Sequence, residues 1–139
     1  MNEKFTDVVT IYNDIPADEV NPRRFFRFVL KNCLIYNALT ESGENTIQRI
    51  INSQSVLSKD TEQYKSPYEY AKLPEDVKEK FFTVQIDDFV VFGEVDDVVT
   101  NSEEFRRLQE KYEDNGFSVT GVNTYTKGGK TNHIHIMHQ

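Results

Sequence analysis

The chain has 139 residues and a mass of 16.2 kDa, and its 16 basic and 23 acidic side chains give a formal net charge of -7. That length predicts a single domain, residues 1–139, large enough to bury a hydrophobic core without disulfide bonds. Hydrophobic residues make up 37% of the chain, which excludes a disordered protein, and no apolar run approaches the roughly 20 residues of a membrane span. The N-terminal segment lacks a signal-peptide pattern and Cys33 is the single cysteine, so the features are typical of a soluble intracellular protein. A sequence pI near 5.0 also argues against a protein that grips DNA through its phosphates.

The first predicted elements are two strands. β-Branched residues in the segment 7–13 predict a strand, and a loop containing Pro16 and Pro22 follows it. Residues 24–37 are rich in Phe, Val, Leu, Ile and Tyr, and a run of that length predicts one long, bent strand.

The middle of the chain gives less uniform signals. Residues 40–45 predict a turn, whereas residues 45–57 fit two structures, because their β-branched residues favour a strand and the spacing of their isoleucines also fits one helix face. The segment 66–69 has serine, proline and glutamate at the positions of a capping box, which predicts a short helix. Residues 74–81 predict a second short helical turn.

The last part of the chain completes a strand-rich pattern. Residues 82–94 predict a strand, and residues 102–112 predict a helix with Ser102 as its N-cap. Residues 119–125 and 133–137 predict a hairpin around the turn 127–130. With about six strands and two or three short helices, the chain is predicted to be mainly β, a small antiparallel β-barrel or sandwich with helical insertions.

The three histidines of the chain all lie within the segment 133–138. On a strand, His133 and His135 point to one face and His138 to the other. A His-hydrophobe-His strand resembles the metal-binding half of the HUH single-strand endonucleases, so His133 and His135 are the candidate metal ligands. The chain has no downstream helix to present a nucleophilic tyrosine, and a polar strand face is the interpretation that we favour. We therefore expect no metal, no cofactor and no catalytic residues.

An acidic stretch contains no basic residue between Lys80 and Arg106. The Asp-x-Asp-x-Asp-Gly pattern of a calcium loop is absent, and two glutamates of the stretch suit the N-terminus of the predicted helix. The pattern therefore favours a solvated acidic edge over an acid–base site. Five of its carboxylates are the candidates for a functional acidic surface: Asp87, Asp88, Glu94, Asp96 and Asp97.

A local basic cluster consists of Arg23, Arg24 and Arg27 among three phenylalanines. Such a cluster is able to stack on nucleic-acid bases, but its arginines more often pair with acidic neighbours while the aromatic rings are buried. Cys33 lies in an apolar run and is predicted to be an inert core residue.

Several short strings, taken together, resemble one family of small Firmicutes prophage proteins that are encoded among head–tail morphogenesis genes. The strongest match is a Phe-Thr-x-Gln-x-Gly-Asp-x-Ile-Val-x-Gly-Glu string, present here as residues 82–94, in which Asp87 stands where the family has glycine. Ile134 likewise replaces a tryptophan of the family, so the chain resembles a divergent member. The weaker matches are residues 9–13, residues 26–30, the Tyr64–Pro67–Tyr70 element, residues 111–114 and residues 133–136.

The resemblance implies a virion structural protein of a tailed bacteriophage, without enzymatic activity. It implies a head-closure, or stopper, component of the head–tail connector, assembled in the host cytoplasm and located in the virion neck. Such proteins are small β-barrels that form rings, which predicts a hexamer or dodecamer around the DNA channel. The implied partners are further copies of the chain, a portal-side adaptor, a tail terminator or tail tube protein, and packaged DNA held without sequence specificity.

The resemblance also assigns expected roles to segments. Residues 40–64 would form an arm or channel-facing loop, and the acidic candidates would line the channel and repel the phosphates of passing DNA. The expected subunit contacts are Arg23, Arg24, Arg27, Tyr64, Tyr70, His133 and His135. The alternatives are a tail terminator or minor capsid protein, a monomeric phage-encoded binding or inhibitor module and, last, an HUH-type nuclease.

Overall fold

A computed structural model describes residues 5–44 and 47–138, with the backbone alone for residues 36–53. Within these residues, seven antiparallel strands form one sheet, accompanied by two α-helices and a 3₁₀ helix. The predicted fold class, mainly β and antiparallel with short helices, is confirmed. The elements are β1 (Asp7–Ile15), β2 (Arg24–Glu44), β3 (Ile47–Ser58), α1 (Pro67–Ala71), the 3₁₀ helix η1 (Glu75–Lys80), β4 (Phe89–Phe92), α2 (Ser102–Lys111), β5 (Gly116–Ser118), β6 (Gly121–Lys127) and β7 (Lys130–His138).

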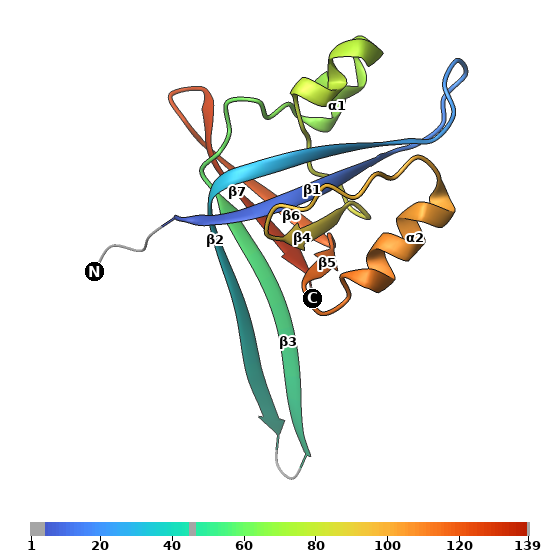
Figure 1. Cartoon of the computed structure of the whole chain (residues 1–139). Helices are drawn as coiled ribbons and strands as arrows, with labels where there is room; N and C mark the ends of the chain where they lie inside the picture. Colours follow the sequence, from blue (N-terminus) through green and yellow to red (C-terminus); the bar gives the residue numbers. More distant parts are fainter. Residues whose placement is uncertain (1–4, 45–46, 139) are drawn as a thin grey trace.

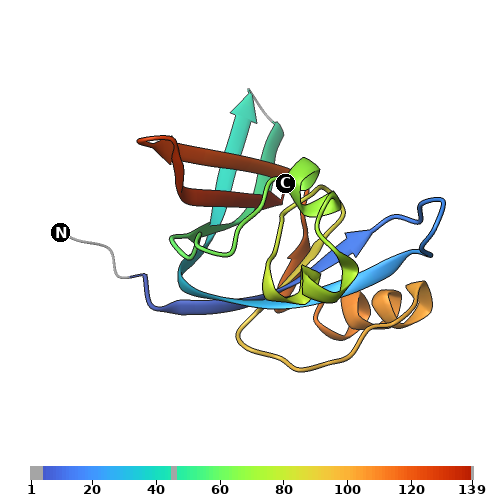
Figure 2. The ribbon, with the colours of Figure 1, turned by 90° about the horizontal axis from the view of Figure 1, so that it is seen from above.

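The strands follow the order β5-β4-β1-β2-β3-β7-β6 across the sheet, so β1 lies between β4 and β2 (Figure 1). The sheet curls, because only two residues connect β5 to β6 and the amide of Thr120 donates to the carbonyl of Met137 at 2.8 Å. This brings the β5 end of the sheet beside the end of β7. The view from above shows the curved arrangement, with the β6–β7 hairpin turned back over β3 (Figure 2).

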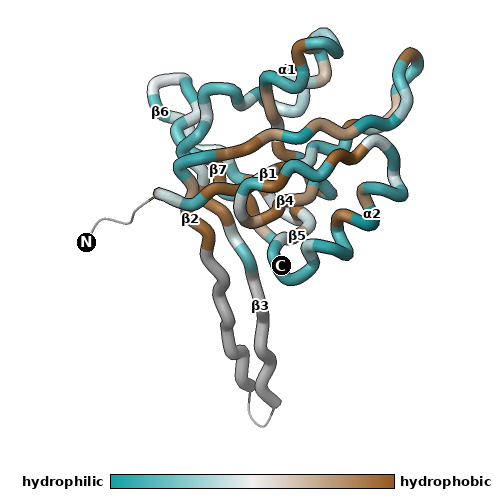
Figure 3. Tube along the Cα trace, in the orientation of Figure 1, coloured by the Kyte–Doolittle hydropathy of each residue, from teal (hydrophilic) through white to brown (hydrophobic). Residues whose placement is uncertain are grey.

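The curled sheet encloses the larger of two hydrophobic cores. Side chains from β1, β2, β3, β4, β5 and β7 meet there with Phe82 and Val84, which precede β4. A second core lies on the outer face, where Phe105 and Leu108 of α2 pack on Tyr12 of β1. The hydropathy tube shows the apolar residues running along β1 and β4 and polar residues over α1 and much of α2 (Figure 3).

β2 is bent at a β-bulge, as the length of its apolar run predicted. Opposite Asp7 and Val9 of β1, the bulge adds one residue to β2, and Asn32 has a left-handed φ of 56°. β2 leaves β1 after Cys33 and continues against β3. Beyond the body, β2 and β3 form a two-stranded ribbon that projects away from all other elements (Figure 1). Residues 45–57, which fitted strand or helix, are strand over their described part.

Local sequence signals placed several element ends correctly. Ser66 caps α1 through a complete capping box with Glu69. The turn between β6 and β7 consists of Gly128 and Gly129, and both have the positive φ that a two-residue hairpin of this type requires.

Three predictions need correction. The N-cap of α2 is Asn101 rather than Ser102, because the Asn101 side chain accepts the Glu104 amide at 2.8 Å. In the segment 82–94, only β4 is regular strand, because the preceding residues turn to bring a carboxylate into the interior. The turn predicted at residues 40–45 is strand up to Glu44, and Asn45 lies outside the described residues.

None of the helices in the described part of the chain is long and apolar enough to cross a membrane. At Asp87, where the resembling family has glycine, φ is +79°. That left-handed conformation is one that glycine adopts at no steric cost and that aspartate tolerates better than most residues.

Truncation of Ile134 tests the contribution of the larger core to stability. Its side chain is fully buried on β7, so we expect Ile134→Ala to lower the free energy of unfolding by about 2–5 kcal/mol through lost burial and a residual cavity. The matched control is Ile86→Ala, because Ile86 is 64% exposed and its truncation should change stability by less than about 0.5 kcal/mol. Urea unfolding followed by circular dichroism measures both, and equal effects would contradict the assignment of the core.

Candidate functional site

The three arginines of the basic cluster are engaged inside the molecule. Arg23 makes two hydrogen bonds to the Asp14 carboxylate, at 2.8 and 2.7 Å, and Arg24 makes two to Glu75, at 2.6 and 3.0 Å. The Nε of Arg27 donates to the carbonyl of Val95 at 2.6 Å. The sequence-based interpretation that these arginines serve acidic neighbours is therefore confirmed for Arg23 and Arg24. Their role as subunit contacts stays a prediction.

The two tyrosines expected at a subunit contact lie against the body. Tyr70 has no exposed surface, and its hydroxyl donates to the carbonyl of Lys78 at 3.2 Å. Tyr64 is partly buried and packs edge-on against Phe82, with 5.6 Å between ring centroids. Burial raises the pKa of both phenols above the ordinary tyrosine value. Tyr70 presents nothing to a neighbouring molecule, so its visible role is packing.

The histidines alternate along β7 as predicted. His133 and His135 lie on the partly exposed face, whereas Ile134 and Ile136 between and after them are fully buried. The His133 ring stacks on Tyr125 of β6 at 4.3 Å, and the Nδ1 of His138 donates to the carbonyl of Ser118 at 2.7 Å. Within the described residues, no three His, Cys, Asp or Glu side chains come together as metal ligands would.

The acidic candidates separate into two environments. Asp87, Glu94 and Asp96 are exposed, and Asp97 is partly buried. Asp88 is only 1% exposed, so its carboxylate contributes nothing to a solvent-facing acidic surface. A run of acidic residues that looks continuous in the sequence is therefore divided by the fold into a surface set and an interior residue.

The Asp88 carboxylate ties the end of β1 to the turn before β4. Its Oδ1 accepts the Asp14 amide at 2.9 Å, and its Oδ2 accepts Asn13 Nδ2 at 2.9 Å and the Gln85 amide at 2.8 Å. The Asn13 side chain also donates to the carbonyl of Thr83 at 2.6 Å. Burial raises the Asp88 pKa to about 7, although the three N–H donors act in the opposite direction. The site holds the turn in place and leaves no accessible carboxylate for catalysis.

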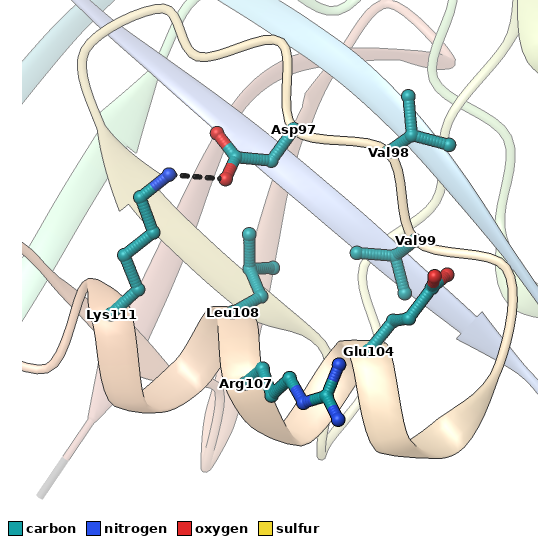
Figure 4. A pocket seen from close by; sticks show the side chains of 7 residues that line it. All are labelled: Asp97, Val98, Val99, Glu104, Arg107, Leu108 and Lys111. Carbon is teal, nitrogen blue, oxygen red and sulfur yellow. Dashed lines mark hydrogen bonds and ion pairs between the residues drawn. The ribbon is translucent and has the colours of Figure 1, made fainter.

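The β4–α2 loop, residues 93–101, is held against the sheet. The Asp97 carboxylate accepts Lys111 Nζ and the Tyr112 hydroxyl, both at 2.7 Å, and these hydrogen bonds lower its pKa. The Tyr12 hydroxyl donates to the Asp97 carbonyl at 2.7 Å. Next to Asp97, Val98 is 78% exposed at the rim of a hollow of about 190 Å³ above α2 (Figure 4).

Two adjoining hollows lie between the β1–β2 loop, α1 and the turn before β4. Their volumes are about 280 and 340 Å³, and both are lined by Pro16, Ala17 and Gln85. Ile86 is exposed beside the second hollow. The sequence singled out neither Ile86 nor Val98 as an exposed residue. An aliphatic residue in an apolar stretch is expected to be buried, and only the long-range contacts show whether it is.

Comparison with known proteins identifies one family. The model of a family of unknown function, DUF6751, matches residues 5–139. No curated protein matches the chain, and no solved structure matches it.

The raised pKa of the buried Asp88 carboxyl predicts that the stability of the protein depends on pH. Its pKa is raised in the folded protein, so the folded state binds more protons than the unfolded state between about pH 4 and pH 7. Asp88 should therefore contribute a fall in the free energy of unfolding as pH rises through this window, of up to about 1.4 kcal/mol per pH unit. Urea unfolding at several pH values measures the slope.

Asp88→Asn should remove this contribution to the slope. Its absolute stability should be lower, because one amide N–H would face the N–H donors that now reach the carboxylate. His135→Gln is the control, because the lowered pKa of His135 makes stability rise with pH and so works in the opposite direction. An unchanged slope in Asp88→Asn would contradict the assignment.

Proposed function

Because the chain belongs to the family of unknown function DUF6751, we propose its function from its own architecture and from its resemblance to prophage head–tail proteins. The proposal is a structural subunit of the head–tail connector of a tailed bacteriophage. It is of the head-closure, or stopper, type and assembles as a ring around the DNA channel in the virion neck. Its partners are further copies, a portal-side adaptor and a tail terminator or tail tube protein.

The projecting β2–β3 ribbon is the observation that carries this proposal. The pairing of β3 with β7 ends at Gln54 and His138, and the pairing of β2 with β1 ends at Cys33. Further out, β2 and β3 pair only with each other, from Ala38 opposite Ser53 to Glu44 opposite Ile47, without a bulge. Seven such residue pairs extend the ribbon about 24 Å beyond the body (Figure 1).

A two-stranded ribbon of this kind has little stability of its own in an isolated molecule. Two strands without further partners are marginally stable in water, and both of their edges present unpaired backbone N–H and C=O groups. In an assembly, neighbouring chains cover those edges by adding strands or packing across them. The ribbon therefore supports the expected arm or channel-facing element at residues 40–64, although its base begins earlier, at the point where β2 leaves the body.

The net charge supports a conduit for DNA rather than a DNA-gripping protein. Each copy carries a formal charge of -7, and a ring multiplies that charge around its axis. An exposed carboxylate such as that of Asp87 would repel phosphates within about a Debye length of 10 Å. DNA could then slide through such a ring without being bound.

Ribbon deletion tests the proposal. Residues 38–53 are replaced by Asn-Gly, which links the paired residues Asn37 and Gln54 through a two-residue turn. We expect unfolding of the body to be unchanged, because the ribbon makes no pairs with it. In the phage that encodes the chain, filled heads should fail to retain DNA, and the infectious titre should fall by about a thousandfold or more.

The control for this experiment is wild-type protein supplied in trans, which should restore the titre. A normal titre with the deletion would contradict the role of the ribbon. Absence of the chain from purified virions would overturn the connector assignment and favour the monomeric binding module. Cleavage of single-stranded DNA with manganese, abolished by His133→Ala, would instead favour the nuclease.

A further inference from the structure

Charge is distributed unevenly along the chain. Residues 1–114 contain all 23 acidic residues and 14 of the 16 basic ones, whereas residues 115–139 contain Lys127, Lys130 and no acidic residue. Those two lysines flank the turn of the β6–β7 hairpin, on the outermost strand pair of the sheet. The β6–β7 hairpin of an acidic protein therefore carries positive charge and no carboxylate of its own.

The β6–β7 hairpin also carries an exposed aromatic residue and an open strand edge. Tyr125 is 45% exposed and is held in place by its stacking on His133 at 4.3 Å. Lys127 and Lys130 are exposed, and neither belongs to an ion pair in the described part of the molecule. β6 pairs with β7 on one side and has no strand on its other side within the described residues.

The complementary surface is the β4–α2 loop together with the hollow above α2. Each basic residue of α2 already has an acidic partner: Arg106 pairs with Glu110, Arg107 with Glu103 and Lys111 with Asp97.

Two exposed carboxylates of this region have no ion-pair partner among the described residues. They are Glu94 and Asp96. The third carboxylate, Glu104, accepts hydrogen bonds from Thr100 and is also stabilised by the charge of Arg107. Val98, exposed between them, adds an apolar contact at the rim of the hollow (Figure 4).

The β4–α2 loop is rigidly attached to the body, which suits it to a preformed interface. The Thr10 hydroxyl donates to the Gly93 carbonyl at 2.8 Å and accepts the Val95 amide at 3.1 Å. Arg27 donates a hydrogen bond to the Val95 carbonyl, and the Tyr12 hydroxyl donates one to the Asp97 carbonyl. An exposed valine on a loop that is fixed at this many points loses little conformational entropy when a partner covers it.

The two surfaces lie on opposite sides of the molecule, as the view from above shows (Figure 2). The β6–β7 hairpin of one copy therefore cannot contact the β4–α2 loop of the same copy. A contact between two different faces is heterologous, and it closes into a ring when the rotation between copies permits.

We propose that the β6–β7 hairpin of one copy docks on the β4–α2 loop of the next copy, with Tyr125 against Val98 and the two lysines facing Glu94 and Asp96. This inference rests on the proposed function, because it names the contact by which that ring would close. Charge complementarity selects a second copy as the occupant, since the acidic loop requires a basic partner and the same chain supplies one.

Charge reversal tests the contact. Lys127→Glu with Lys130→Glu should weaken self-association by about tenfold or more, and Glu94→Lys with Asp96→Lys should do the same, because each places like charges opposite one another. An equimolar mixture of the two reversed variants should recover association through the one compatible pair of faces. The matched control, Lys31→Glu with Lys80→Glu, changes exposed lysines outside both surfaces and should leave association unchanged. Sedimentation velocity over a concentration series, and with connector rings present, measures the effect.

A disulfide cross-link tests the geometry directly. Tyr125→Cys and Val98→Cys variants are mixed and oxidised, and a covalent dimer should form only in the mixture. Background from Cys33 should be low, because that thiol is fully buried and burial raises its pKa to about 11.

The outcomes separate the two proposals. Rings that form without the cross-link and resist charge reversal would overturn this contact and leave the connector function standing. A chain that stays monomeric even with connector rings would overturn both. DNA binding that depends on Lys127 and Lys130, with no effect of those residues on association, would assign the hairpin to nucleic acid and overturn the contact.

Discussion

β1 is hydrogen-bonded to β2 along one edge and to β4 along the other, and it is buried on both faces. Val9 and Ile11 point into the core inside the curled sheet, and Tyr12 points into the core under α2. A strand in this position has no free surface, so each polar group on it must find a partner inside the protein. Thr10 and Asn13 are fully buried, and both are hydrogen-bonded to segments that flank β4.

The polar residues of β1 thereby position the surface segments on both sides of β4. Asn13 and the Asp14 amide hold the turn before β4 through Asp88, and Thr10 and Tyr12 hold the loop after β4. Because both segments are anchored from below, the side chains between the anchors are presented outward in fixed positions. The need to hydrogen-bond the buried polar groups of β1 thus fixes the positions of the surface segments before and after β4.

Ion pairing determines which charges are available to partners. The arginines of the aromatic cluster and the basic residues of α2 are each engaged within the molecule, so they contribute little net field. Among the charges without an ion pair are Glu94 and Asp96 on the β4–α2 loop and the two lysines of the β6–β7 hairpin, at opposite sides of the body. The β2–β3 ribbon is a third such feature, because its outer part pairs with no further strand in the described part of the molecule. All three features are ones that the proposed ring of copies would use.

The sequence by itself determined much of the local structure. β-Branched runs indicated β1, β2 and the terminal hairpin, the Ser66 capping box placed α1, and Gly128-Gly129 placed the tightest turn, because each signal depends on the conformational preferences of adjacent residues. The tertiary structure alone decided which members of one acidic run are buried. Asp87 and Asp88 are neighbours with the same side chain, yet one is exposed and the other lies 2.9 Å from Asn13, 75 positions earlier in the chain. Burial and charge pairing depend on such long-range contacts, so no local pattern separates an interior carboxylate from one that is free to meet a partner.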